Sequence, residues 1–177
     1  MRYLLAITAL IIMSTTTKAQ NIIKKYETST DSINGRVVFR GLVDFKALDA
    51  EPTFDWYDNG IAKYKPKKRY INTLKNELPK YSIVVVMGTW CGDSRDMLPK
   101  LHNVLEQSGY PMDKLAMYGV DRSKTTGHGQ EKPYDIHFVP TVILFDGSKE
   151  IGRIIETVHK SVEADLAAII SKYNKSK

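Results

Sequence analysis

The chain has 177 residues, 42% hydrophobic and 26% charged, which is typical of one globular domain with an additional segment and excludes a disordered or collagen-like protein. The formal net charge of +6 is a modest basic excess. A single cysteine excludes an internal disulfide and any metal site that needs a pair of cysteines.

Residues 1–19 predict a signal peptide. Arg2 supplies a positive charge, residues 4–13 form an apolar run, and the small residue Ala19 precedes an expected cut before Gln20. The run is shorter than the ~20 residues that span a bilayer. We therefore expect an exported protein, periplasmic or secreted, with no stable membrane anchor after cleavage. The alternative is an uncleaved N-terminal anchor.

Residues 20–66 predict a leader and an N-terminal extension that is mostly helical. The polar stretch 20–35 indicates a mobile leader, and 36–49 fits a strand, a helix or one followed by the other. An aromatic cluster at 54–61, interrupted by a polar tripeptide at 58–60, indicates packing for this extension.

Five basic residues cluster next, with tyrosines interleaved: Lys63, Lys65, Lys67, Lys68 and Arg69. Such a pattern can contact nucleic acid. A solvated helix start explains it equally well, and exported proteins rarely meet nucleic acid. We therefore expect no nucleic-acid partner.

From residue 67 onward the pattern alternates between helices and strands, which predicts a second segment over 67–177. The β-branched run 83–87 is typical of a strand buried on both faces. Helices are predicted over 67–78, 94–107 and 161–173, and strands over 83–87, 115–120, 141–145 and 151–155, with a polar loop at 122–136. This order predicts an α/β fold with a mixed central sheet flanked by helices.

The only cysteine, Cys91, lies between the buried strand and the next helix. Free N–H groups and the dipole at a helix N-terminus favour negative charge, so a thiolate is stabilised there. The following residues Gly92, Asp93 and Ser94 are small or polar, unlike the surroundings of a structural cysteine. The sequence therefore favours a reactive thiol, with a buried structural cysteine as the alternative.

Short motifs follow one another between residues 81 and 173: Trp90-Cys91-Gly92, Pro99, Asp121, Val139-Pro140-Thr141, and Asp146-Gly147 with Gly152. In this order they resemble the thioredoxin family. The Trp-Cys-Gly-Asp-Ser site is similar to that of exported thioredoxin-like proteins in Bacteroidetes-type bacteria. The resemblance implies a thioredoxin-like fold with a cis-proline opposite the active-site cysteine. It also implies a substrate groove lined by Trp90, Gly92, Asp93, Val139, Pro140 and Thr141.

The site departs from the family pattern at three positions. Ser94 replaces the second cysteine, which resolves mixed disulfides, and we expect its hydroxyl to donate to the Cys91 thiolate. Val85 replaces a buried carboxylate that serves that second cysteine. Asp93 replaces a proline, and its charge either opposes the thiolate or caps the helix. Cys91 and Ser94 are therefore the predicted catalytic residues of a monothiol site that needs an external thiol.

Three functions fit this sequence. The first is a thiol–disulfide oxidoreductase or isomerase of monothiol type, acting in redox homeostasis on thiol- or disulfide-containing client proteins with an external thiol reductant. The second is a weak or inactive thioredoxin-fold module that holds clients. The third is glutathione or iron–sulfur binding, as in monothiol glutaredoxins. That family's lysine before the cysteine and its Gly-Gly-Asp motif do not occur here.

The four histidines are His102, His128, His137 and His159, and they show no metal-ligand spacing. His137 adjoins the predicted cis-proline motif, where it could approach Cys91. We interpret it, like His128, as an ordinary loop residue. We therefore expect neither a metal nor a cofactor.

Overall fold

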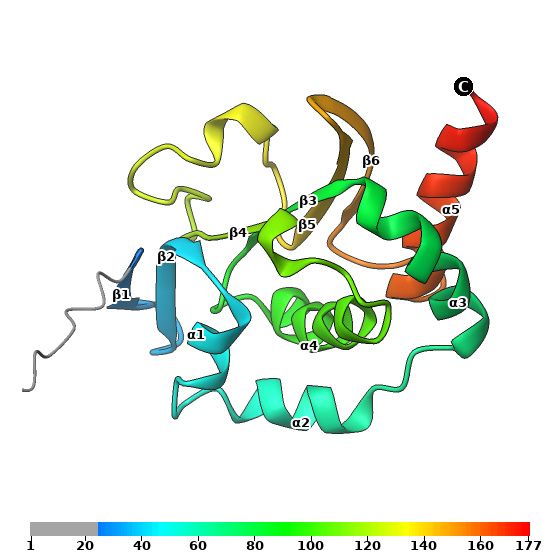
Figure 1. The fold of residues 1–177 in the computed structure, drawn as a ribbon. Helices are drawn as coiled ribbons and strands as arrows, with labels where there is room; N and C mark the ends of the chain where they lie inside the picture. Colours follow the sequence, from blue (N-terminus) through cyan, green and yellow to red (C-terminus); the bar gives the residue numbers. More distant parts are fainter. Residues whose placement is uncertain (1–24) are drawn as a thin grey trace, which may run out of the picture.

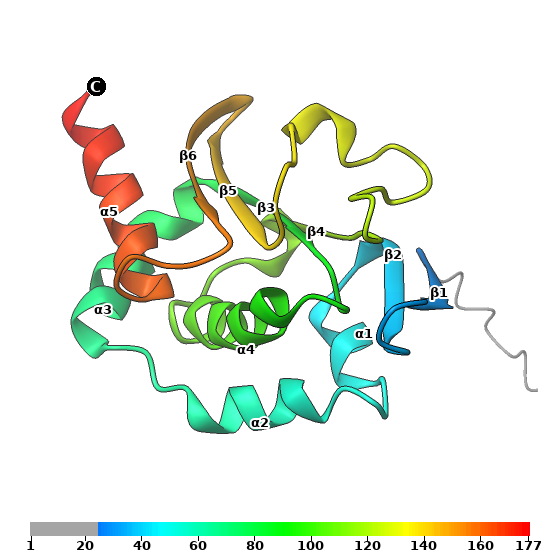
Figure 2. The same ribbon diagram turned by 180° about the vertical axis from the view of Figure 1, so that it is seen from behind.

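The computed structural model describes residues 25–177, so the predicted signal peptide lies outside the described residues (Figure 1). Its centre is a six-stranded sheet in the order β1-β2-β4-β3-β5-β6. Helices lie on one side of this sheet and the loop that precedes β5 on the other, as both views show (Figures 1 and 2). Among the described helices, none is long and apolar enough to cross a membrane.

The middle of the sheet is the predicted mixed arrangement. Strand β3 (Ser82–Met87) pairs in parallel with β4 (Leu115–Gly119) and antiparallel with β5 (Thr141–Asp146). Strand β6 (Lys149–Ile155) continues the sheet beyond β5 through a tight turn. Five of the six residues of β3 are buried, which explains its unbroken run of valine, isoleucine and methionine.

The N-terminal extension differs from the prediction, because it is not mostly helical. It contributes β1 (Tyr26–Thr30) and β2 (Val37–Val43) to the sheet before the helices α1 (Phe45–Asp49) and α2 (Asp55–Lys63) begin. Strand β2 pairs antiparallel with β4, and β1 forms the edge. The expected mobile leader thus contains a strand. Four of its five residues are exposed, and such a polar edge strand resembles a loop in sequence.

Helix α2 also runs through the polar tripeptide at 58–60, which the sequence predicted as an interruption. The reason is its packing against α4 (Gly92–Gln107). A Cβ on Gly60 would lie 2.5 Å from Pro99 Cγ, so only glycine lets the two helices approach this closely. This tertiary contact outweighs the low helix propensity of glycine.

Two hydrophobic clusters fill the spaces on either side of the sheet. The larger contains Ile83, Val85 and Met87 of β3 together with residues of α2, α4, α3 (Lys68–Glu77) and α5 (Val162–Lys175). The smaller contains Val84 and Val86 of β3 with residues of the 120–143 region. Three single turns of 3₁₀ helix complete the structure, η1 (Leu78–Lys80), η2 (Met112–Lys114) and η3 (Lys132–Tyr134).

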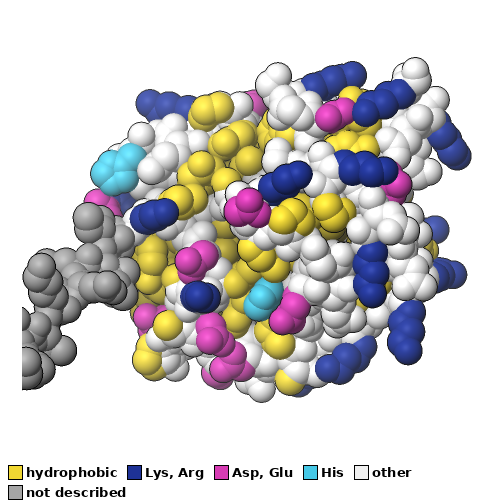
Figure 3. All heavy atoms as spheres, in the orientation of Figure 1, with side chains coloured by type: hydrophobic (Ala, Val, Ile, Leu, Met, Phe, Trp, Pro, Cys, Tyr) yellow, Lys and Arg dark blue, Asp and Glu magenta, His cyan; other side chains and the backbone are white. Residues whose placement is uncertain are grey.

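The basic cluster at 63–69 lies at the connection between α2 and α3, and its five basic residues are all exposed. Figure 3 shows Lys and Arg side chains gathered on the side of the molecule where α3 and α5 lie. One interleaved aromatic points inward, because the Tyr64 hydroxyl donates to the buried carboxylate of Glu163 at 2.6 Å. The cluster is therefore a group of solvated basic side chains around the start of a helix, α3.

Candidate functional site

The thiol of Cys91 lies where β3 gives way to α4. Cys91 is the N-cap residue of α4, and its side chain does not cap the helix. Its backbone N–H donates to the Gly88 carbonyl at 2.9 Å, which forms the turn. The half-buried Sγ lies 3.3 Å from the Val139 carbonyl oxygen, to which the thiol donates weakly. The thiol therefore has one polar contact and remains partly open to solvent.

The segment opposite the thiol leads into β5. The Val139–Pro140 peptide bond is cis. Val139 is buried, and the Thr141 hydroxyl donates to the Phe138 carbonyl at 2.7 Å, which braces the segment. The Phe138 side chain is 52% exposed, a large apolar group on the surface just before the residue that contacts Cys91. The structure thus brings this predicted groove segment next to the thiol.

Neighbouring residues hold both the indole ring of Trp90 and, as described below, its backbone carbonyl. Its indole Nε1 donates to the Val120 carbonyl at 2.8 Å, and the Arg122 guanidinium lies over the ring, 4.7 Å from the centroid. A Cβ on Gly88 would lie 2.6 Å from the indole, so the ring packs directly on that backbone. Trp90 is therefore a fixed wall beside Cys91.

Arg122 is itself fixed by a carboxylate from the extension. Its Nε and Nη2 donate to the two oxygens of Asp31 at 2.7 and 2.8 Å, a bidentate pair. The Asp31 side chain is only 4% exposed, so its charge depends on this partner. The hydrogen bonds from Arg122 lower the pKa of the Asp31 carboxyl. They also raise the pKa of Arg122, to which the nearby Cys91 adds a smaller attraction.

The turn between β1 and β2 holds the carbonyl of Trp90. The Asn34 amide donates to this oxygen at 3.4 Å, and Arg36 Nη1 donates to it at 3.1 Å. Asp31 closes the turn, because its backbone N–H donates to the Arg36 carbonyl and its carboxylate accepts from the Asn34 N–H. Sequence reasoning missed these contacts. The Asn34-Gly35 pair, a residue pair typical of tight turns, was the available hint.

Ser94 does not contact the thiol as the sequence predicted. Its Oγ accepts from the Gly88 N–H at 3.1 Å, and no hydrogen bond joins it to Cys91 within residues 25–177. The side chain is completely buried, one helical turn into α4. The reason is geometric, because this position of the first turn faces the end of β3. Ser94 therefore stabilises the turn that carries Cys91.

The two residues between Cys91 and Ser94 are exposed. Asp93 is not the helix cap, since Cys91 occupies that position, and it lies instead in the first turn, where the helix dipole favours its charge. A Cβ on Gly92 would meet no atom within 4 Å. Packing therefore does not require this glycine, and the surface next to the thiol is left without a side chain.

Within residues 25–177, no hydrogen bond joins a histidine to the Cys91 thiol. The His137 ring lies 3.1 Å from Asp135 and is 72% exposed, and His128 lies 3.5 Å from Glu27. The ring of His102 is bonded to the Tyr57 hydroxyl at 2.7 Å, and burial lowers the pKa of this histidine. Within the described part of the chain, no group of three or more His, Cys, Asp or Glu residues could hold a metal ion.

The comparison with protein families decides the identity of the fold. The family model for thioredoxin matches residues 61–172, more than half of the chain. The chain belongs to the thioredoxin family. Membership supports redox or thiol–disulfide function in general terms, with thiol- or disulfide-containing clients. A search of curated proteins finds no match. The predicted boundary at residue 67 is not tested and stays a prediction.

The chain is also similar, at low sequence identity, to several solved structures. A protein of unknown function from Pseudomonas aeruginosa is 14% identical, with 75% of this chain and 82% of that chain covered and a TM-score of 0.47. Mitochondrial thioredoxin 3 from Saccharomyces cerevisiae is 17% identical, with 64% and 98% covered and a TM-score of 0.35. A mutant thioredoxin from Halobacterium salinarum is 18% identical, with 62% and 86% covered and a TM-score of 0.35. These low scores carry no argument about function.

Proposed function

We propose that this thioredoxin-family protein performs thiol–disulfide exchange with Cys91 as its only thiol. The observation that carries the proposal is the position of the Cys91 Sγ, half-buried at the N-cap of α4 and 3.3 Å from the Val139 carbonyl. Its side chain is not used to cap the helix. A thiolate there lies at the positive end of the α4 dipole, which favours negative charge.

The reaction needs the Cys91 thiol and a thiol from outside this chain, which belongs either to the client or to a small molecule. The Cys91 thiolate attacks one sulfur of a client disulfide, which forms a mixed disulfide and releases the other client sulfur as a thiolate. A different client thiolate, or an external small thiol, then attacks the client sulfur of the mixed disulfide and returns Cys91 as a thiolate. With the other client thiolate the net reaction is isomerisation. With one external thiol the client is left carrying that thiol in a mixed disulfide, and a second external thiol completes reduction of the client and leaves as the external disulfide.

The surface around Cys91 supports docking of an apolar client segment. Gly92 leaves open space on one side of the thiol, and Trp90 forms a fixed wall. Two large apolar side chains are exposed in the segments that contact this loop, Ile33 at 72% and Phe138 at 52%. Ile33 lies in the turn that holds the Trp90 carbonyl, and Phe138 precedes the carbonyl that accepts from the thiol.

A disulfide-bonded peptide with a fluorescent group on one cysteine tests the exchange. We expect the purified, reduced protein to form a mixed disulfide with it at neutral pH and a small thiol to release the peptide again. Cys91→Ser removes the attacking sulfur and abolishes the adduct. Ser148→Ala is the matched control, because it keeps the sulfur and changes an exposed serine in the turn between β5 and β6. A wild-type protein that forms no adduct unless it is unfolded contradicts the proposal.

The second candidate is a module that captures clients without turning them over. The surroundings of Ser94 favour this second function. Ser94 stands where a second thiol would resolve a mixed disulfide, and its buried hydroxyl faces Gly88. The two functions differ in the release step. A mixed disulfide that survives excess small thiol, or client capture that Cys91→Ser leaves intact, supports the binding module.

Export of the chain is part of the same proposal. The apolar run at 4–13 and the small residue Ala19 support cleavage before Gln20 and a periplasmic or secreted protein. N-terminal sequencing of the protein recovered from cell fractions tests this. A chain that starts at Gln20 in the periplasmic or extracellular fraction is the expected result, and an intact N-terminus in the membrane fraction contradicts it.

A further inference from the structure

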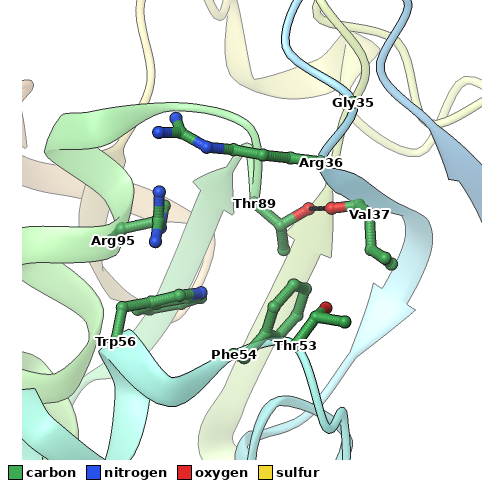
Figure 4. Close-up of a pocket in the computed structure, with 8 residues that line it drawn as sticks. All are labelled: Gly35, Arg36, Val37, Thr53, Phe54, Trp56, Thr89 and Arg95. Carbon is green, nitrogen blue, oxygen red and sulfur yellow. Dashed lines mark hydrogen bonds between the residues drawn. The ribbon is translucent and has the colours of Figure 1, made fainter.

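A pocket of about 200 Å³ lies between the N-terminal extension and the first turn of α4 (Figure 4). Phe54 and Trp56 form its aromatic side, and Arg36 and Arg95 line it from the β1–β2 turn and from α4. Thr89, two residues before Cys91, also lines it. The extension therefore builds a cavity that is separate from the predicted client groove but adjoins the thiol loop.

The two arginines of the pocket have no carboxylate partner. Figure 4 shows their side chains extended toward one another above Trp56. Arg36 Nη1 donates to the Trp90 carbonyl, and the Arg95 guanidinium lies 5.5 Å from the Trp56 ring centroid. Within residues 25–177, neither arginine forms an ion pair. The buried Nε of Arg95 has no hydrogen-bond partner.

The electrostatic environment of the Arg95 guanidinium is unfavourable. Burial lowers the pKa of Arg95, and repulsion from Arg36 lowers it further, while Asp55 opposes both effects more weakly. An unsatisfied buried donor on a charged group is costly. A bound anion would pair with the Arg95 guanidinium and would reduce the repulsion between the two guanidinium groups.

The two threonine hydroxyls that line the pocket are already engaged. The Thr89 hydroxyl donates to the Val37 carbonyl at 2.7 Å and accepts from the Phe39 N–H at 3.2 Å. The Thr53 hydroxyl donates to Glu51 at 2.8 Å. Among the described residues, the side-chain donors left for a ligand are therefore the guanidinium groups and the indole N–H of Trp56, and the remaining wall is aromatic. This combination suits a ligand with a charged acceptor at one end and an apolar body.

We propose that this pocket binds the carboxylate of a small organic acid, whose apolar part packs against Phe54 and Trp56. The planar fork of a guanidinium matches the two oxygens of a carboxylate. An inorganic oxyanion would use the arginines but would leave the aromatic wall without a partner. The site does not require the Cys91 sulfur, so it stands independently of the proposed exchange reaction.

Calorimetric titration of the purified protein with phenylacetate tests the site. We expect one phenylacetate per chain and binding at least about tenfold weaker for the neutral analogue phenylacetamide, because the charge-assisted hydrogen bonds are lost. Inorganic phosphate at the same ionic strength should bind more weakly than phenylacetate. Cys91→Ser should bind phenylacetate like the wild type, which separates this result from any failure of the exchange reaction.

Arg95→Gln is the decisive variant, with Arg69→Gln as its matched control. Arg69 is an exposed arginine of α3 that stacks on Tyr70 and does not line this pocket. Arg95→Gln should weaken phenylacetate binding about tenfold or more, and Arg69→Gln should leave it unchanged. In the wild-type protein, the NMR signal of the Arg95 Nε–H should shift on titration, a readout that does not depend on how the variant folds.

Three results would overturn the proposal. The first is no binding of phenylacetate together with an unmoved Arg95 Nε–H signal. The second is equal affinity for phenylacetate and phenylacetamide, which would show an apolar site without carboxylate recognition. The third is tighter binding of phosphate than of phenylacetate, which would make the pocket a general oxyanion site.

Discussion

Two pairs of charged residues lie beside the thiol loop, and they differ in how their charge is balanced. Arg122 is paired in bidentate fashion with the buried Asp31, and its guanidinium covers Trp90. Arg36 and Arg95 face a pocket without a carboxylate partner among the described residues. The extension supplies one member of each pair. We call Arg122 and Asp31 the balanced pair, because their opposite charges neutralise each other, and Arg36 and Arg95 the unbalanced pair. The comparison shows that the balanced pair holds the structure together, whereas the unbalanced pair is suited to binding a ligand of opposite charge.

The largest effect is expected from breaking the balanced pair. Arg122→Ala leaves the Asp31 carboxylate buried without a partner and removes the cation from the Trp90 ring, so the melting temperature should fall by several degrees. Circular dichroism melts measure this, with Arg69→Ala as the exposed control. An Arg122→Ala protein that melts like the wild type would show that Asp31 finds another partner.

A smaller effect is expected from pH. The pKa of Asp31 is lowered in the folded protein, so its ionised pair contributes full stability above the ordinary aspartate value of about 3.9 and loses it as the pH falls through the lowered folded value. The stability difference between wild type and Asp31→Asn should therefore be constant between about pH 5 and 7 and shrink below about pH 4. Urea unfolding at each pH measures it. A difference that instead grows below pH 4 would contradict the lowered pKa.

The smallest effect on stability is expected at the unbalanced pair. Arg95→Gln removes a cation–π contact with Trp56, worth ~0.5–1 kcal/mol, but it also removes the repulsion from Arg36. The free energy of unfolding should therefore change by less than about 1 kcal/mol in either direction. Urea unfolding without added ligand checks this. A loss as large as that of Arg122→Ala would mean that Arg95 is structural after all.

The sequence predicted the parts of the fold that depend on local patterns. The buried run 83–87, the apolar spacing of 94–107 and the hairpin after Phe145 all signal their structures within a few residues, and each is confirmed. The position of Cys91 at a helix start follows from the same patterns. These elements form the region that the thioredoxin family model matches.

The errors arose where contacts between distant residues decide the structure. Strand β1 is polar because it lies exposed at the sheet edge, and α2 continues past Gly60 because Pro99 packs against it. The Asp31–Arg122 pair joins residues 91 positions apart, which no periodicity signals. The expected contact of Ser94 with the thiol failed because helix geometry turns that side chain toward Gly88.

The turn at Asp31–Arg36 has a practical consequence for the choice of a fragment of this protein for experiments. The family match begins at residue 61, after the turn and both of its strands. A fragment that starts at that boundary would keep Cys91 and the cis-proline, yet it would lack Asp31, Asn34 and Arg36. In this fragment the Trp90 carbonyl would lack its donors Asn34 and Arg36. Arg122 would lack the buried Asp31 carboxylate with which it pairs. The boundary drawn by homology therefore cuts through the surroundings of the thiol, and its chemistry is best studied in the longer chain.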